Sequence, residues 1–185
     1  MSAAAASDQV PLCVDLDGTL IAGDTLVISL RELARRRPWK LPEVAIALAR
    51  GRGEMKTAVA AYVVPNPSQL PWRAAVVDFV RAQHAQGRRV LLATAAHRRI
   101  AEAVASYLTC FDGIVATDGS DNAKGAAKVA AIRRAIGAGP FDYVGDSIAD
   151  LPIFAAARHG YLVAPSPELH RQAAQAGTIV KVFDA

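Results

Sequence analysis

The chain has 185 residues, of which 52% are hydrophobic and 21% are charged, and its net charge at pH 7 is +4. This length suffices for one sizeable core but not for two ordinary domains, and the composition excludes an intrinsically disordered chain. No uncharged apolar run approaches the roughly 20 residues of a membrane-spanning helix, and residues 1–7 lack the basic region of a signal peptide, so we expect a cytoplasmic protein.

Apolar runs and helical patterns alternate along the chain. Apolar residues at helical spacing predict helices around residues 72–80, 100–108 and 129–136, with Gly87 and Gly137 as stops for the first and the last. This alternation predicts an α/β fold, a doubly wound parallel sheet with helices on both faces and ligands at the carboxyl ends of the strands. The predicted strands are residues 11–16, 89–93, 113–116, 141–144, 161–163 and 178–182.

One segment breaks this alternation. Residues 24–71 contain helical patterns and no clear strand, and we predict that they form a helical cap inserted above the carboxyl edge of the sheet. The whole chain, residues 1–185, would then be one domain whose core is residues 8–23 and 72–185. The predicted cap helices are residues 24–37, 41–50 and 54–63.

The positive charge of the chain lies in this cap segment. Residues 24–72 contain eight basic and four acidic side chains, so the rest of the chain is neutral. Aromatic residues do not alternate with the basic ones, and we therefore do not expect nucleic-acid binding. A solvated helical face, a funnel for an anionic substrate and a surface that meets lipid are the interpretations left open.

Two carboxylates directly follow the first predicted strand, in the sequence Asp15-Leu16-Asp17-Gly18-Thr19-Leu20. At a strand end both can point into one crevice, where one binds metal or attacks a substrate and the other transfers protons. The turn would also offer the backbone N–H groups of Gly18 and Thr19 to a phosphate oxygen. The alternative interpretation is a surface turn that happens to be acidic.

A second acidic motif, Gly145-Asp146-Ser147-Ile148-Ala149-Asp150, follows the fourth predicted strand. Asp146 and Asp150 lie one helical turn apart and could face the same crevice as the first pair. Four carboxylates in one place repel each other unless a divalent cation lies among them, and oxygen ligands suit Mg²⁺. Alternatively, these side chains cap the helix that begins here.

Two weaker signals accompany the acidic motifs. Thr94, followed by Ala95, ends the second predicted strand, and Lys124 precedes the helix at residues 129–136. A hydroxyl and an ammonium group could each hold a phosphoryl oxygen, with Ala95 as a further substrate-binding position. Taken separately, Thr94 could be a helix cap and Lys124 a solvated lysine.

In this order, the four signals resemble the motifs of the haloacid dehalogenase superfamily of aspartate-nucleophile hydrolases. Asp15-x-Asp17-Gly18-Thr19-Leu20 matches the first motif, Thr94 the second, Lys124 the third and Gly145-Asp146-x-x-x-Asp150 the fourth. A helical cap between the first two motifs is similar to that of the phosphoserine phosphatase branch. The chain also resembles the N-terminal domain of fusions with UbiA-type membrane prenyltransferases, through stretches such as Arg36-Arg37-Pro38-Trp39 and Lys124-Gly125-Ala126-Ala127-Lys128.

The resemblance implies a Mg²⁺-dependent phosphomonoester hydrolase that works through a phospho-aspartate. Asp15 would attack phosphorus, and Asp17 would protonate the leaving oxygen and then deprotonate water. Asp15, the Asp17 carbonyl and Asp146 would hold Mg²⁺, with Asp150 completing the metal site or orienting the lysine.

The remaining site residues follow from the same resemblance. Thr94 and Lys124 would hold the transferring phosphoryl group, and Lys128, one helical turn later, is the alternative lysine. Asp24 would meet an amino group of the substrate, or would cap the first cap helix.

The substrate implied is a small organic phosphate or a phosphorylated prenyl or sugar-lipid intermediate. Phosphoryl transfer to a second alcohol is one alternative. The other is a non-catalytic phosphate-binding module that docks on a membrane prenyltransferase.

Overall fold

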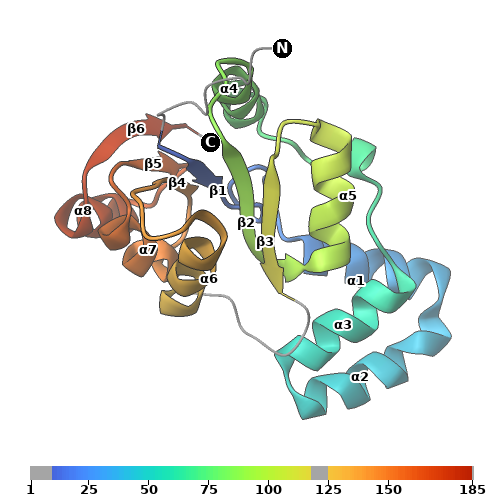
Figure 1. Cartoon of the computed structure of the whole chain (residues 1–185). Coiled ribbons are helices and arrows are strands. Elements are labelled where there is room, and N and C mark those ends of the chain that lie inside the picture. Colours follow the sequence, from blue (N-terminus) through green and yellow to red (C-terminus); the bar gives the residue numbers. More distant parts are fainter. Residues whose placement is uncertain (1–9, 118–124, 185) are drawn as a thin grey trace.

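Six parallel strands form one sheet in the order β3-β2-β1-β4-β5-β6 (Figure 1). The computed structural model describes residues 10–117 and 125–184. Each strand overlaps its predicted range, and the parallel sheet confirms the predicted α/β fold. The strands are β1 (Leu12–Val14), β2 (Val90–His97), β3 (Gly113–Thr117), β4 (Asp142–Gly145), β5 (Gly160–Val163) and β6 (Ile179–Phe183).

Helices cover both faces of the sheet. Alternate residues of β2 join different cores, since Val90 and Leu92 pack on one face while Leu91 and Ala93 pack on the other. The doubly wound arrangement is therefore confirmed. The first face carries α4 (Ala74–Ala85) and α5 (Arg98–Leu108), and the second carries α6 (Ala126–Ile136), α7 (Leu151–Ala156) and α8 (Pro167–Ala176).

The central strand is β1, which pairs with β2 on one side and β4 on the other. Cys13 in β1 lies opposite Leu91 of β2 and Tyr143 of β4. Because the order of the strands reverses at this point, the carboxyl ends of β1 and β4 border a crevice in which a ligand can bind.

The three helices predicted in residues 24–71 are present, and we call them the cap helices. They are α1 (Thr25–Arg36), α2 (Leu41–Arg50) and α3 (Arg52–Tyr62), with the short 3-10 helices η1 (Pro38–Lys40) and η2 (Pro67–Gln69) beside them. They enclose a small hydrophobic cluster of their own, built on Leu33, Met55 and Val59. In Figure 1 α2 lies outermost, with α3 between α2 and the sheet. No helix in the two described stretches is long and apolar enough to cross a membrane.

A buried ion-pair cluster connects the start of β4 with the residues before β2, at the amino ends of the strands and so at the opposite end from the crevice. Asp142, the first residue of β4, accepts hydrogen bonds from Arg88 and from Arg158, the latter at 2.8 and 3.0 Å. Asp142 and Arg88 are both buried, and the Arg88 guanidinium also donates to the Val10 carbonyl at 2.8 Å. Arg88 therefore depends on Asp142 for its counter-charge.

Asp142→Ala is expected to lower the free energy of unfolding by about 3–5 kcal/mol, because it leaves the buried Arg88 guanidinium without its carboxylate. Urea unfolding monitored by circular dichroism measures this loss. Asp78→Ala is the matched control, because Asp78 is exposed on α4 and its removal is expected to change stability by less than about 0.5 kcal/mol. Equal stability of the two variants would contradict the importance of the cluster.

Candidate active site

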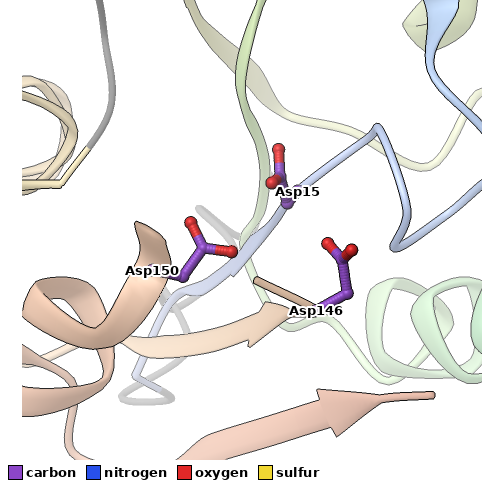
Figure 2. A group of neighbouring side chains, drawn as sticks. All are labelled: Asp15, Asp146 and Asp150. Carbon is purple, nitrogen blue, oxygen red and sulfur yellow. The ribbon is translucent and has the colours of Figure 1, made fainter. Parts of the chain in front are cut away.

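Three carboxylates converge at the crevice between β1 and β4. Asp15 directly follows β1, Asp146 directly follows β4, and Asp150 ends the 3-10 helix η3 (Ile148–Asp150). One oxygen from each side chain lies within 4.8 Å of the others. Figure 2 shows the three side chains around one space beyond the strand ends. The structure thus brings together three of the residues that the sequence analysis singled out.

The turn after β1 holds Asp146 in place. Gly18 has a φ of +80°, and a Cβ atom there would lie 1.9 Å from Asp146 Oδ2, so a glycine is required for this approach. The Thr19 hydroxyl donates to Asp146 Oδ1 at 2.8 Å. The Gly18 N–H, predicted to meet a phosphate oxygen, donates to the Gly23 carbonyl at 2.9 Å. In this structure Gly18 leaves space for Asp146 and stabilises the turn, and Thr19 orients the Asp146 carboxylate.

A buried lysine lies against the carboxylates. Lys128 Nζ is 3.0 Å from Asp15 Oδ1 and 3.7 Å from Asp150 Oδ1, and it donates to the Tyr143 hydroxyl at 2.7 Å. That hydroxyl donates in turn to Asp150 Oδ1 at 3.0 Å. Lys128 is the alternative lysine of the sequence analysis, whereas Lys124 lies outside the described residues.

The electrostatics of this group favour a bound cation. Burial raises the pKa of Asp146 to about 6 despite the Thr19 hydrogen bond, and burial also raises the pKa of Asp150. Asp150 Oδ2 is buried and has no hydrogen-bond partner in the described part of the chain. Three carboxylates facing one ammonium group leave an excess of negative charge. Hard oxygen ligands with one unsatisfied oxygen fit a divalent cation such as Mg²⁺.

Asp17 also lines the crevice, but it is not one of the three clustered carboxylates. Its Oδ1 accepts a hydrogen bond from the Thr25 N–H at 2.7 Å, at the start of α1. Burial outweighs this hydrogen bond and raises the pKa of Asp17 to about 7. A carboxyl group with this pKa can both give and take a proton near neutral pH.

The other predicted residues differ in whether they reach the crevice, and Thr94 is not among the residues that line it. Thr94 is buried in β2, and its hydroxyl accepts from the Ala96 N–H at 3.0 Å where the pairing of β2 with β3 shifts register. Ala95 lines the crevice. Asp24 lines it too, and its side chain accepts from the N–H groups of Leu26 and Val27, which confirms the interpretation of Asp24 as the cap of α1.

The crevice is a cleft of about 190 Å³ between the carboxylates and the cap helices. Arg52 and Lys56 from α3 line it together with apolar side chains, and Lys56 Nζ donates to the Ala95 carbonyl at 2.6 Å. Neither residue was predicted to belong to the site, because an isolated basic residue in or beside a predicted helix forms no motif. Tyr143 was not predicted either, because an aromatic residue inside a predicted strand indicates core packing.

A sequence model of the haloacid dehalogenase-like hydrolase family matches residues 43–155 of this chain. The chain belongs to this family. The resemblance predicted from the motifs is thereby confirmed, and so is the expectation of a hydrolase family. The match spans Asp146 and Asp150, whereas Asp15 and Asp17 precede it.

The chain is 35% identical over 175 residues to the uncharacterized protein y4nM of Sinorhizobium fredii (strain NBRC 101917 / NGR234). The alignment covers 95% of this chain and 34% of that protein, so the chain spans about a third of the length of this relative. The resemblance to prenyltransferase fusions stays a prediction.

Solved structures share the fold at low sequence identity. A protein of unknown function from Bordetella pertussis Tohama I has a TM-score of 0.69 and 18% identity, over 93% of this chain and 98% of that one. A substrate-bound phosphoserine phosphatase has a TM-score of 0.60 and 12% identity, over 97% of this chain and 94% of that one. Both similarities support the arrangement of strands and helices.

Proposed function

We propose that this haloacid dehalogenase-like protein is a phosphomonoester hydrolase whose nucleophile is Asp15. The observation that carries the proposal is the 3.0 Å contact between Asp15 and the buried Lys128, at a place where two further carboxylates converge. A carboxylate fixed beside an ammonium group, with a proton-exchanging Asp17 two residues later, suits in-line attack on a phosphate ester.

The reaction has two steps. In the first, a carboxylate oxygen of Asp15 forms a bond to phosphorus while the ester P–O bond breaks, and Asp17 gives its proton to the leaving alcohol oxygen. In the second, water attacks the phosphorus atom and passes a proton to Asp17, the bond between Asp15 and phosphorus breaks, and inorganic phosphate leaves. The positive charge of Lys128 offsets the negative charge that gathers on the phosphoryl oxygens.

The carboxylates would hold Mg²⁺ through Asp15, Asp146 and Asp150, together with the Asp17 carbonyl. Bound there, Mg²⁺ would supply positive charge to the phosphoryl group during both steps. The buried and unpartnered Asp150 Oδ2 supports this assignment. We also propose that Thr94 contributes to the site indirectly. Its hydrogen bond with the Ala96 N–H would hold the end of β2, where the pairing with β3 shifts register, next to the crevice.

The lining of the cleft supports two substrate classes. Arg52 and Lys56 add positive charge on the cap side, and Leu26, Val59 and Ile100 add apolar surface. This combination favours a small organic phosphate with an anionic or partly apolar leaving group, including a phosphorylated prenyl or sugar-lipid intermediate. The cytoplasmic location and the link to a membrane prenyltransferase stay predictions.

Phosphate release from a panel of serine, sugar, nucleotide and prenyl phosphates tests the proposal, with Mg²⁺ and with EDTA. We expect Mg²⁺-dependent release of free phosphate from at least one member. A phosphorylated acceptor in place of free phosphate would indicate a phosphotransferase. Phosphate release that is unchanged by EDTA would contradict the metal site, and no release from any member would favour a binding module.

Mg²⁺ is expected to stabilise the wild-type protein but not Asp146→Asn. At about 100 times its dissociation constant, a ligand of the folded state adds about 2.7 kcal/mol to the free energy of unfolding. The asparagine keeps an oxygen for the Thr19 hydroxyl, so the fold is retained while one metal ligand loses its charge. Thermal unfolding with Mg²⁺ and with EDTA measures the difference.

In EDTA, Asp146→Asn is expected to be at least as stable as the wild type, because it removes one of three mutually repelling charges. Asp78→Asn on α4 serves as the charge-matched control, and it should gain from Mg²⁺ as much as the wild type. An equal gain in Asp146→Asn would rule out Asp146 as a metal ligand.

A further inference from the structure

The outermost cap helix, α2, exposes an unusual amount of apolar surface. Val44 is its buried residue, whereas Ile46 is 58% exposed and Leu48 is 50% exposed. Trp39, in η1 directly before α2, is 67% exposed. A surface helix ordinarily presents charged and polar residues to solvent, so this face needs an explanation.

The exposed apolar residues form one continuous face. At 100° per residue, they follow one another around the helix through about 160°, from Leu48, which is next to the buried Val44, to Ile46. The polar residues of α2, Glu43 and Arg50, lie at the edge of this face, and Glu43 is paired with Lys40 at 2.6 Å. We call this surface the α2 apolar face, and it consists of Leu41, Pro42, Ala45, Ile46, Leu48 and Ala49, with Trp39 at its start.

Basic residues flank α2 along the chain. Residues 31–52 contain seven basic and two acidic side chains, and both acidic ones are in ion pairs, Glu32 with Arg36 and Glu43 with Lys40. Exposed arginines therefore precede and follow α2 along the chain, and none of them has an acidic partner among the residues that the structure describes. These arginines are Arg31, Arg35 and Arg37 before the helix and Arg50 at its end.

Charge selects among the possible occupants of this face. A second copy of the chain docked on this face would bring the arginines at the two ends of α2 close to those of the other copy, and like charges repel. An anionic bilayer matches both parts of the surface, because its headgroups attract arginine and its interface accepts aliphatic side chains and an indole ring. We propose that α2 docks the protein on an anionic membrane surface, with Trp39, Ile46 and Leu48 in the interface.

Vesicle binding tests this proposal with the full chain and without substrate, so its result is independent of the proposed phosphatase activity. The probes are vesicles of phosphatidylcholine alone and vesicles of phosphatidylcholine and phosphatidylglycerol in equal parts. We expect binding at least about tenfold tighter to the anionic vesicles, since each basic residue near such a surface contributes about 1 kcal/mol. In a Trp72→Phe background, a blue shift of Trp39 fluorescence reports its entry into the interface.

Two double variants separate the apolar and the electrostatic contributions. Ile46→Gln/Leu48→Gln and Arg35→Gln/Arg37→Gln are each expected to weaken binding to anionic vesicles by about tenfold or more. Val180→Gln/Val182→Gln on β6 is the matched control, because Val180 is 48% exposed and Val182 is 38% exposed on another face. The control is expected to bind as the wild type does, and circular dichroism verifies that all variants fold.

Three results would overturn the proposal. They are the absence of wild-type binding, equal binding to both kinds of vesicle, and unchanged binding by the Ile46→Gln/Leu48→Gln variant. Sedimentation velocity identifies the competing occupant. If the wild type self-associates and this variant does not, a second copy covers the face and the membrane proposal is wrong.

Discussion

Asp15→Asn is expected to abolish phosphate release, with a loss in kcat/KM of at least about 10³-fold. The amide cannot form the bond to phosphorus, yet it has nearly the shape of the carboxylate. Its oxygen can still accept the hydrogen bond that the Leu16 N–H gives to Asp15 Oδ1 at 2.8 Å. The variant should therefore fold as the wild type does, and steady-state phosphate release on the best substrate measures the loss.

Trapping of the intermediate makes this prediction specific to covalent catalysis. Wild-type protein quenched during turnover of a radiolabelled substrate is expected to carry protein-bound phosphate that hydroxylamine releases, as an acyl phosphate does. Asp15→Asn should carry none. Asp17→Asn, which keeps the nucleophile, is the informative partner because it should slow both steps without removing the site of attachment. Labelled protein in Asp15→Asn would place the nucleophile elsewhere.

Lys128→Met is expected to lower kcat/KM by about 10²–10³-fold, the usual cost of removing one group that stabilises charge in the transition state. Lys128 Nζ contacts both Asp15 and Asp150, so its loss leaves the carboxylates without their ammonium partner. Methionine keeps the unbranched apolar stem and so limits the packing defect around the Tyr143 ring.

Lys124→Met is the matched comparison, because it makes the same substitution four residues earlier in the sequence. We expect it to retain kcat/KM within about threefold of the wild type, a difference of less than about 1 kcal/mol. Circular dichroism and Mg²⁺-dependent stabilisation verify that both variants keep the fold and the metal site. A larger loss in Lys124→Met than in Lys128→Met would return the phosphoryl-binding role to Lys124 and make Lys128 a structural residue.

Much of the fold could be predicted from the sequence because the apolar runs are short and well separated. All six strands overlap their predicted ranges, and α2 has the predicted bounds. The helix expected to begin at the second acidic motif is α7, which has only six residues, and α8 was not predicted because it buries only Leu169 and Ala173, too few for a periodic pattern. Trp72, expected in a helix, lies before α4, where its ring stacks on Tyr107 at a centroid distance of 5.9 Å.

The acidic part of the site was predictable for a topological reason. Asp15 and Asp146 each follow a strand, and parallel strands end at the same edge of the sheet. The choice between Lys124 and Lys128 was not, because four positions of sequence spacing do not say which lysine reaches the carboxylates. Lys128 is buried beside the Tyr143 hydroxyl, and this placement depends on tertiary packing that sequence spacing does not encode.

The hydrogen bond between Thr19 and Asp146 joins residues that are 127 positions apart. Contacts of such high sequence separation form late in folding, because a long loop must close before they can stabilise the chain. While the protein emerges from the ribosome, the first acidic motif is already present long before Asp146, which follows β4, is made. The nascent chain therefore carries Asp15 and Asp17 before the cation site that we propose can form, and the proposed hydrolysis requires that β1 and β4 have paired.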